Sequence, residues 1–302
     1  MSGGDGAGAE RGAERAVTPA LVSTEWVAAH LDDAGVRVAD VRWYLPQVGK
    51  RGREEYGKGH IPGAVFVDMD TELAGPRGSG PGRHPLPASD VFASAMSRAG
   101  VGAETHVVVY DDAGGSIAAR LWWLLRHMGH PRVSVLDGGV TRWAAEGRPL
   151  TTVVPEVQPV EFTATPATGD VVAKDAVRRL SRDPGAVVLD ARAAERYEGR
   201  AEPIDPRAGH IPGARSAPFG ANLREEEGAR LKPAEALRAQ YAALGVTPGR
   251  RVVAYCGSGV TACHTLLALH VAGVSGALLY EGSWSDWSSD ESLPAATGVA
   301  PG

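Results

Sequence analysis

Valine-rich runs alternate along the chain with stretches of helical composition. Residues 105–110 and 250–255 are rich in β-branched side chains and end at a turn, as buried strands do. Helical stretches follow them at 117–128 and 261–272. Because strands that alternate with helices form a mainly parallel sheet with helices on both faces, this order predicts an α/β fold.

Three more segments have helical composition, with Asp90 as the expected N-cap of the first: 91–98, 173–180 and 233–244. In parallel sheets of this kind, functional sites form beyond the carboxyl ends of the strands. Asp111 directly follows the first valine-rich run, and Cys256 directly follows the second. The two residues therefore occupy equivalent positions at which chemistry is expected.

The pattern of strands and helices occurs twice along the chain. Four short segments of the first half recur in the same order in the second half, at offsets between 144 and 150 residues. A repeated order of this kind indicates one structural unit duplicated in tandem. The matched segments are 38–42 with 188–192, 59–64 with 209–214, 107–111 with 252–256, and 136–143 with 280–287.

We therefore expect two tandem domains, at 18–148 and 167–293, each a mainly parallel sheet flanked by helices. Between them, residues 149–166 are rich in proline, threonine and valine without a helical period, which is typical of an extended linker. Residues 1–17 are charged and rich in glycine and alanine, so they are expected to form a disordered tail, and residues 294–302 a second tail.

Composition narrows the class of protein. The chain has 302 residues, of which 43% are hydrophobic and 22% charged, so wholesale disorder is excluded and two domains fit the length. A net charge of −5 gives no general electrostatic reason to bind nucleic acid or an anionic membrane. The longest apolar stretch, about 260–274, is too short and too polar to span a bilayer, and residues 1–17 lack the apolar core of a signal peptide. We expect a cytoplasmic protein.

The chain has two cysteines, Cys256 and Cys263, which make no disulfide framework and are too few for a structural zinc site. The nine histidines show no metal-ligand spacing, so no metal is expected. Cys256 begins the loop Cys-Gly-Ser-Gly-Val-Thr-Ala between a strand and a helix. Gly257 and Gly259 let the loop curl so that backbone N–H groups point inward, and the following helix adds its positive end. This setting favours a thiolate at Cys256 and a second anion beside it.

Three chemistries fit a cysteine in an anion cradle. A cysteine phosphatase needs arginine six positions after the cysteine, but that residue is Ala262. A dinucleotide fingerprint G-x-G-x-x-A is formally present from Gly257 to Ala262, but it should open a domain, and only 40 residues follow it. A sulfurtransferase, in which the thiolate accepts a sulfur atom and the amides hold the persulfide, remains as the third chemistry.

Three motifs carry a resemblance to a known family. Residues 56–67 read Tyr-x3-His-Ile-Pro-Gly-Ala-x2-Val, and residues 277–287 read Ala-x2-Tyr-Glu-Gly-Ser-Trp-x-Asp-Trp, with Asp286 where glutamate is usual. Residues 83–87 read Arg-His-Pro-Leu-Pro. Together they resemble the tandem-domain rhodanese-type sulfurtransferases over about residues 18–293. The resemblance implies a catalytic C-terminal domain and an inactive N-terminal domain, in which Asp111 replaces the cysteine.

The resemblance also implies a sulfur donor. Family members that act on 3-mercaptopyruvate carry the loop Cys-Gly-Ser-Gly-Val-Thr, as residues 256–261 do here, whereas members that act on thiosulfate carry basic side chains just after the cysteine. We therefore favour 3-mercaptopyruvate, with thiosulfate as the alternative. By family position, Arg196 is the expected carboxylate-binding arginine. A second family arginine does not align cleanly here, and Arg207 or Arg200 is the candidate for it.

The expected reaction is covalent catalysis without a cofactor. Arg196, Arg207 and the loop residues Gly257, Gly259 and Val260 bind the donor, and Cys256 takes its sulfur. Ser258 and Thr261 stabilise the developing enolate, and cyanide, a thiol or a carrier protein removes the sulfur. A low-turnover sulfur carrier or redox sensor is the non-enzymatic alternative.

Several polar residues are expected to be structural. His60 and His210 lie in the repeated His-Ile-Pro-Gly-Ala turn, which the inactive copy shares, and Asp40 and Asp190 should brace the strand ends. Cys263 is expected to pack as a small apolar side chain, with a redox role beside Cys256 as the alternative.

Overall fold

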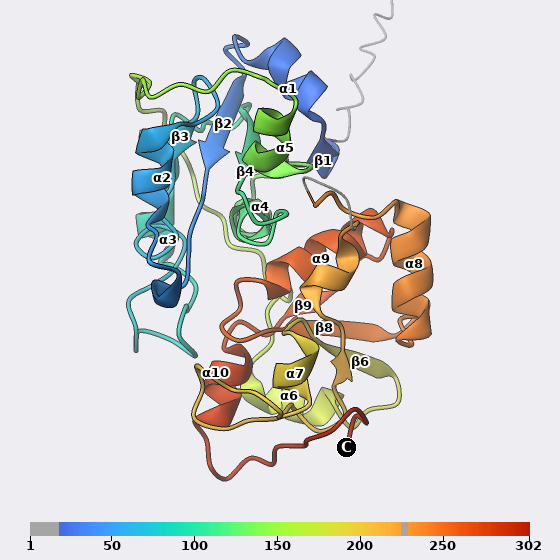
Figure 1. Ribbon diagram of the computed structural model, residues 1–302. Coiled ribbons are helices and arrows are strands. Elements are labelled where there is room, and N and C mark those ends of the chain that lie inside the picture. The colour runs from blue at the N-terminus through green and yellow to red at the C-terminus, as the bar shows by residue number, and fades with distance from the viewer. Residues whose placement is uncertain (1–17, 225–228) are drawn as a thin grey trace, which may run out of the picture.

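Two parallel β-sheets, one in each half of the chain, organise the protein (Figure 1). The computed structural model describes residues 18–224 and 229–302, so the tail expected at 1–17 lies outside the described residues. The first sheet has the order β1-β5-β4-β2-β3, and all of its pairs are parallel. Its strands are β1 (Leu21–Val22), β2 (Val36–Asp40), β3 (Val65–Phe66), β4 (His106–Tyr110) and β5 (Val133–Leu136).

The second sheet repeats this topology in the order β7-β6-β8-β9, again with parallel pairs. A single parallel bridge from Val171 to Leu279 stands where β1 stands in the first sheet. The expected tandem α/β fold is confirmed. The strands are β6 (Ala186–Asp190), β7 (Arg215–Ser216), β8 (Arg251–Tyr255) and β9 (Leu278–Leu279).

The five predicted helical stretches each contain an α-helix whose ends lie within two residues of the predicted ones. One detail was wrong: α3 begins at Ser89, so Asp90 lies in its first turn and is not its N-cap. The helices are α1 (Thr24–His30), α2 (Gly52–Lys58), α3 (Ser89–Arg98), α4 (Ala118–His127), α5 (Gly139–Ala145), α6 (Lys174–Leu180), α7 (Ala194–Tyr197), α8 (Ala234–Ala243), α9 (Ala262–Val271) and α10 (Ser283–Ser288), with 3-10 turns at Pro46–Val48 and Phe219–Asn222. None of the helices in the described part of the chain has the length and apolar composition needed to cross a bilayer.

The expected bracing at the strand ends is present in both copies. Asp40, at the end of β2, forms a buried ion pair with Arg42 at 2.6 Å, and Arg42 donates to the carbonyl of Gly59. Asp190, at the end of β6, pairs with Arg192 at 2.6 Å, and Arg192 donates to the carbonyl of Gly209. Each ion pair therefore ties a strand end to the start of the repeated His-Ile-Pro-Gly turn.

The two repeated histidines are structural, as expected. The Nδ1 atom of His60 hydrogen-bonds the carbonyl of Tyr56 at 2.9 Å, and that of His210 hydrogen-bonds the carbonyl of Tyr197 at 2.8 Å. Each imidazole stacks on the ring of the same tyrosine. Both side chains are buried, and equivalent contacts in the two copies fix the entry to β3 and β7.

Helices α4 and α9 join the two domains through one hydrophobic core (Figure 1). Residues of α9 are buried on all sides, as is typical of a helix covered by a sheet on one face and a second helix on the other. His264 of α9 is fully buried, and its Nε2 atom hydrogen-bonds the carbonyl of Gly114 in the N-terminal domain at 3.2 Å. This hydrogen bond and the shared core hold the two domains against each other.

We expect this interface to weaken in acid. Burial lowers the pKa of His264 from 6.5 to about 4, so below pH 6.5 the unfolded chain binds a proton that the folded chain excludes. The contribution of neutral His264 to the free energy of unfolding is complete above pH 6.5. It is lost as the pH falls towards 4, by about 2 kcal/mol between pH 7 and 5. Urea unfolding at several pH values should show a shallower pH slope for His264→Gln than for the wild type. Equal slopes would contradict this assignment.

Candidate active site

Cys256 lies directly after β8, at the carboxyl end of the second sheet. Its side chain is buried, and its sulfur accepts the backbone N–H of Gly259 at an N–Sγ distance of 3.1 Å. The segment that begins α10 holds the cysteine backbone from behind, because Ser283 accepts its N–H and Trp284 donates to its carbonyl. The predicted cradle therefore directs at least one amide at the sulfur.

The turn after the cysteine requires glycine at one position. Gly259 has a φ of +84°, and a Cβ atom there would lie 2.5 Å from the carbonyl oxygen of Glu281. Any side chain at this position would have to displace backbone and, with it, the amide that contacts the sulfur. The left-handed conformation and the close approach together explain the glycine at position 259.

The equivalent loop of the N-terminal domain shows the same cradle filled by a side chain. Asp111 stands where Cys256 stands, and it is buried. Its carboxylate accepts four backbone N–H groups at 2.7 to 2.9 Å, from Ala113, Gly115, Ile117 and Ala118. The duplicated loop is thus built to surround an anion, which in this copy is permanently supplied by the chain itself.

The N-terminal domain places a histidine against the catalytic loop. The Nδ1 atom of His84 lies 2.7 Å from the hydroxyl of Ser258, and its Nε2 atom lies 3.8 Å from a carboxylate oxygen of Asp70, which is too far for a direct hydrogen bond. Burial, together with the nearby cations Arg120 and Arg83, lowers the pKa of His84 to about 4. At neutral pH, Ser258 therefore bonds to an uncharged imidazole.

Arg120 of α4 fixes the positions of both loops. Its side chain is fully buried, and it donates to the carbonyls of Leu73, Gly259 and His84 at 3.2 to 3.3 Å. Buried charge is tolerated only where its donors are satisfied. One guanidinium therefore ties the catalytic loop of one domain to the His84 segment of the other.

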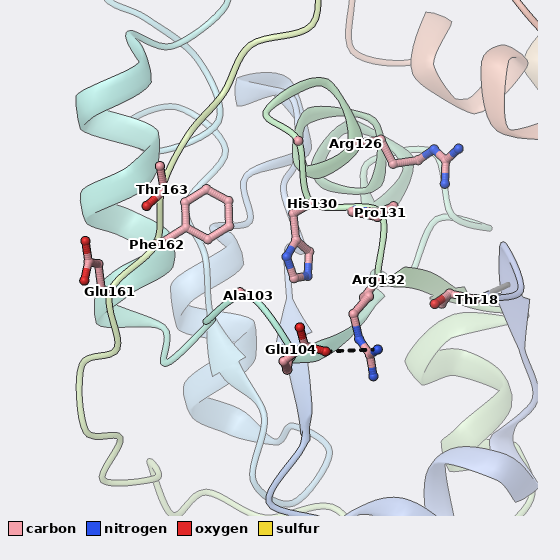
Figure 2. A pocket seen from close by; sticks show the side chains of 11 residues that line it. Thr18, Ala103, Glu104, Arg126, His130, Pro131, Arg132, Glu161, Phe162 and Thr163 are labelled. Carbon is pink, nitrogen blue, oxygen red and sulfur yellow. Dashed lines mark hydrogen bonds and ion pairs between the residues drawn. The ribbon is translucent and has the colours of Figure 1, made fainter. Parts of the chain in front are cut away.

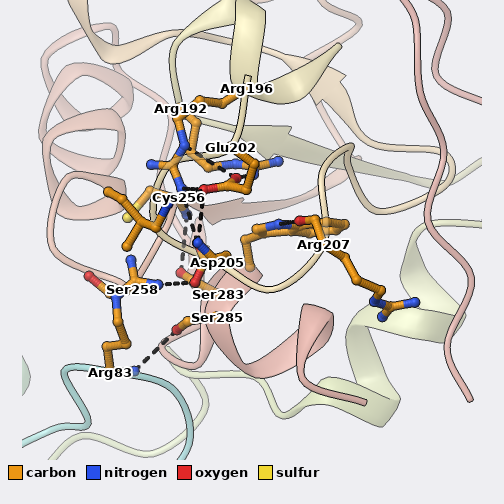
Figure 3. Close-up of polar contacts among 12 residues, drawn as sticks. Arg83, Arg192, Arg196, Glu202, Asp205, Arg207, Cys256, Ser258, Ser283 and Ser285 are labelled. Atoms are coloured by element: carbon orange, nitrogen blue, oxygen red, sulfur yellow. Dashed lines mark hydrogen bonds and ion pairs between the residues drawn. The ribbon is translucent and has the colours of Figure 1, made fainter. Parts of the chain in front are cut away.

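A cluster of charged side chains lies near Cys256 (Figure 3). Arg196 of α7 contacts Glu202 at 2.6 Å and Asp205 at 3.0 Å, and Asp205 also forms an ion pair with Arg83 of the N-terminal domain. The predicted Arg196 is thus close to the loop: its Nη1 atom lies 3.5 Å from where a Cβ of Gly257 would be.

Arg207 is not brought to the cysteine in this structure. Its guanidinium donates to the carbonyls of Trp287, Ser288, Asp290 and Leu293, so it anchors the segment after α10. Because these carbonyls occupy its donors, we assign Arg207 a structural role in place of the expected donor-binding one. Arg200 is exposed and pairs with Glu198.

The remaining predicted residues occupy the start of α9. Val260 is buried, and Thr261 precedes the helix; in the described part of the chain, its hydroxyl makes no hydrogen bond. Cys263 is fully buried, donates to the carbonyl of Gly259, and has its pKa raised by burial to about 12. A protonated, inaccessible thiol supports the packing interpretation of Cys263.

Sequence reasoning missed the roles of Arg83, His84, Glu202 and Asp205. Arg83 and His84 were noted only as part of a family motif, and no local spacing links them to a loop 174 residues further along. Glu202 and Asp205 lie in the short segment where the sequence departs from the family pattern. In the sequence, this departure from the family pattern was the signal that the charged residues of the segment are arranged differently.

Two hollows flank these elements. A groove of about 660 Å³ between the domains is lined by Arg83, His84, Trp43 and Ile204, and its His84 contacts Ser258 of the loop. A separate hollow of about 730 Å³ lies on the N-terminal domain, among His130, Arg132 and Phe162 (Figure 2). It contains no cysteine, and its Arg132 pairs with Glu104 at 3.4 Å. The first groove is therefore the candidate entrance.

The fold and the cysteine loop define a class of protein. The family model of the rhodanese-like domain matches residues 23–146 and 173–290, and the two matches cover both sheets. The chain belongs to the rhodanese family.

Several known proteins are similar to the chain over both of its domains. The chain is similar to a "Probable 3-mercaptopyruvate sulfurtransferase" of Pseudomonas aeruginosa, at 42% identity over 92% of this chain and 98% of that one. It is 39% identical to human 3-mercaptopyruvate sulfurtransferase over 89% of this chain and 91% of that one. The structure of SseA from Escherichia coli superposes with a TM-score of 0.78 at 37% identity, over 89% of this chain and 100% of that one.

We expect Gly259→Ala to lower the reactivity of Cys256 about tenfold. The new Cβ displaces the loop amide from the sulfur, and losing one hydrogen bond to a charged group costs about 1.5 kcal/mol. The rate of iodoacetamide labelling of Cys256 at pH 7 measures the effect. Gly276→Ala is the matched control, because it has a φ of +70° but open space around the Cβ. Equal rates in the two variants would contradict the assigned contact.

We expect Asp111→Ala to destabilise the protein by about 3 kcal/mol or more. Four buried N–H groups would lose their acceptor, and each unsatisfied group costs about 1–3 kcal/mol before relaxation or water entry. Denaturant unfolding measures the loss. Asp112→Asn, at the adjacent partly buried carboxylate, keeps an oxygen acceptor for the Tyr44 hydroxyl and is the control, which should cost under about 1 kcal/mol. A similar loss in both variants would refute the role of Asp111.

Proposed function

We propose that this protein transfers a sulfur atom from 3-mercaptopyruvate to a thiophilic acceptor through a persulfide on Cys256. The observation that carries the proposal is the sulfur of Cys256, held by the Gly259 amide in an anion cradle with Arg196 alongside. The names of the human and bacterial relatives support the same reaction.

In the first half-reaction, the Cys256 thiolate attacks the sulfur of the donor. A sulfur–sulfur bond forms and the carbon–sulfur bond breaks, and its electron pair passes to pyruvate as the enolate, which takes a proton from solvent. The Ser258 hydroxyl, held by His84, is the donor proposed for the developing enolate oxygen. Thiol chemistry of this kind needs no metal or organic cofactor.

In the second half-reaction, an acceptor attacks the outer sulfur and releases the Cys256 thiolate. We propose that cyanide, a small thiol or a carrier protein serves as the acceptor, entering by the groove between the domains. Amides of the loop at Gly257, Gly259 and Val260 hold the persulfide anion meanwhile. Support comes from the Asp111 loop, where amides that include those of Gly115 and Ile117 surround a carboxylate.

The donor has a specific alternative. A relative in Mycobacterium tuberculosis, 40% identical over 268 residues, is provisionally named a thiosulfate sulfurtransferase. The residues right after Cys256 are Gly and Ser, which add no positive charge for a dianionic donor. A single carboxylate beside Arg196 fits this cluster better, and this favours 3-mercaptopyruvate.

Two further proposals concern the domain boundaries and the cellular compartment. We place the inactive domain at 18–148 and the catalytic domain at 167–293, joined by the linker at 149–166. A reducing compartment such as the cytoplasm fits a mechanism that needs a free thiolate, and both cysteines are free in the structure.

The test is turnover with each donor. We expect the protein to convert 3-mercaptopyruvate and cyanide to pyruvate and thiocyanate, with a higher kcat/KM than for thiosulfate and cyanide. Cys256→Ser should abolish both reactions, because a hydroxyl does not form the persulfide, whereas Cys263→Ser should retain activity. Activity that survives Cys256→Ser would overturn the enzyme proposal. Faster turnover with thiosulfate would overturn the donor, and stoichiometric persulfide without turnover would favour the carrier alternative.

A further inference from the structure

The two domains hold each other through a pair of similar backbone contacts. The backbone N–H of Leu86, in the N-terminal domain, donates to the carboxylate of Glu281 at 3.1 Å. The backbone N–H of Leu231, in the C-terminal domain, donates to the carboxylate of Asp137 at 2.9 Å. Each acceptor is an acidic residue just after the last strand of the opposite sheet. The domains therefore exchange one segment in each direction across their interface.

The duplicated sequence places both partners of these contacts at equivalent positions. Asp137 and Glu281 occupy the same place in the matched segments that end the two copies. Leu86 lies three positions before the first residue of α3, and Leu231 lies three positions before the first residue of α8. The two leucines are offset by 145 residues, as the central-strand segments are. The two contacts are thus copies of one another, related by the duplication.

The copies differ in what the exchanged segment carries. His84 lies two positions before Leu86, and its Nδ1 atom lies 2.7 Å from the Ser258 hydroxyl in the cysteine loop. The segment of Leu231 packs instead against the loop of the inactive copy, in which Asp111 fills the cradle. Only the Glu281 contact therefore adjoins the proposed reacting residues.

Two anchors hold the backbone on either side of His84. The N–H of Arg83 donates to the Ser285 hydroxyl at 3.1 Å (Figure 3), and the N–H of Leu86 donates to Glu281. Both acceptors belong to the catalytic domain. The imidazole is therefore placed on the catalytic loop by backbone contacts one residue before it and two residues after it.

Glu281 also touches the catalytic loop through its own backbone. A Cβ atom on Gly259 would lie 2.5 Å from the carbonyl oxygen of Glu281, and the Gly259 amide donates to the sulfur of Cys256. Among residues 18–224 and 229–302, the one hydrogen-bond partner of the Glu281 carboxylate is the N–H of Leu86. The backbone of Glu281 thus lies against the residue that holds the sulfur, while its side chain holds the segment of His84.

We infer that Glu281 is a positioning residue for sulfur transfer, which holds the His84 imidazole against Ser258 through the backbone of Leu86. Asp137 is its structural counterpart and makes the same contact away from the nucleophile. The inference rests on the proposed function for the reaction that these groups serve, whereas the placement of the imidazole does not depend on it. Residue 281 has to supply an oxygen acceptor, and its negative charge is not required.

Three substitutions separate the acceptor from the charge and from the interface. Glu281→Ala removes the acceptor, so the orientation of Ser258 is lost. In steady-state assays of pyruvate release from 3-mercaptopyruvate, kcat should fall about tenfold while KM changes less than about threefold. Glu281→Gln keeps an oxygen acceptor without the charge and should stay within about threefold of the wild type. Asp137→Ala, the matched control, removes the equivalent contact and should also stay within about threefold.

A second readout does not depend on the donor. Burial and nearby cations lower the pKa of His84 to about 4, so release of Leu86 should admit water and raise this pKa towards 6.5. NMR titration of the imidazoles between pH 5 and 8, assigned with His84→Gln, should show the rise in Glu281→Ala alone. Glu281→Gln also controls for the lost charge. The charged groups that face the imidazole are the same in every variant: Asp70, Arg77, Arg83 and Arg120.

The outcomes distinguish this inference from the proposed function. If the wild type releases no pyruvate but the pKa of His84 rises only in Glu281→Ala, the proposed reaction is wrong and the placement of His84 by Glu281 stands. If the wild type turns over while Glu281→Ala keeps both kcat and the low pKa, the inference is refuted and the proposed function stands. Equal losses of kcat in Glu281→Ala and in either Asp137→Ala or Glu281→Gln also refute it. Should Glu281→Ala fail to fold, Glu281→Met takes its place, because methionine has a similar volume and no oxygen acceptor.

Discussion

The guanidinium of Arg120 lies buried between the two domains and donates to backbone carbonyls of both. Its partners belong to the catalytic loop at Gly259 and to the segment of the other domain that carries His84. A buried cation needs all of its donors satisfied, and here neither domain satisfies them alone. The interface is therefore part of the site, because separating the domains would remove the Gly259 acceptor from the buried Arg120 guanidinium and would release both loops. This dependence gives the inactive copy a physical reason to be present.

The two copies differ in what fills the cradle at the end of the central strand. In the first, Asp111 fills it, its carboxylate taking four amides and becoming a buried structural anchor. In the second, Cys256 accepts one amide at its sulfur. The duplicated loop therefore holds a structural carboxylate in one copy and the proposed nucleophile in the other. Backbone donors suit both groups because they respond to negative charge and not to the identity of the group.

Much of the architecture was predictable, because it depends on local patterns. The valine-rich runs became β4 and β8, the stretches after them became α4 and α9, and the duplicated His-Ile-Pro-Gly turns bear equivalent contacts at His60 and His210. Cys256 could be singled out because it follows a strand end, and Arg196 because it matches a family position; the roles of both stay predictions. The contacts of Arg207 could not be predicted, because its segment departs from the family pattern and gave no information about the carbonyls that surround it.

The sequence by itself determined the α/β units and their duplication, and it predicted the candidate nucleophile and the copy that carries it, since strand periodicity, glycine spacing and the cysteine are properties of neighbouring residues. Only the tertiary structure decided which charges meet. Arg83 and His84 reach the loop from more than 170 residues away, and Asp205 is shared between arginines of two domains. The reason is physical: ion pairs and hydrogen bonds depend on distances in space, and those distances are set by how α4 packs on α9, which no local pattern encodes.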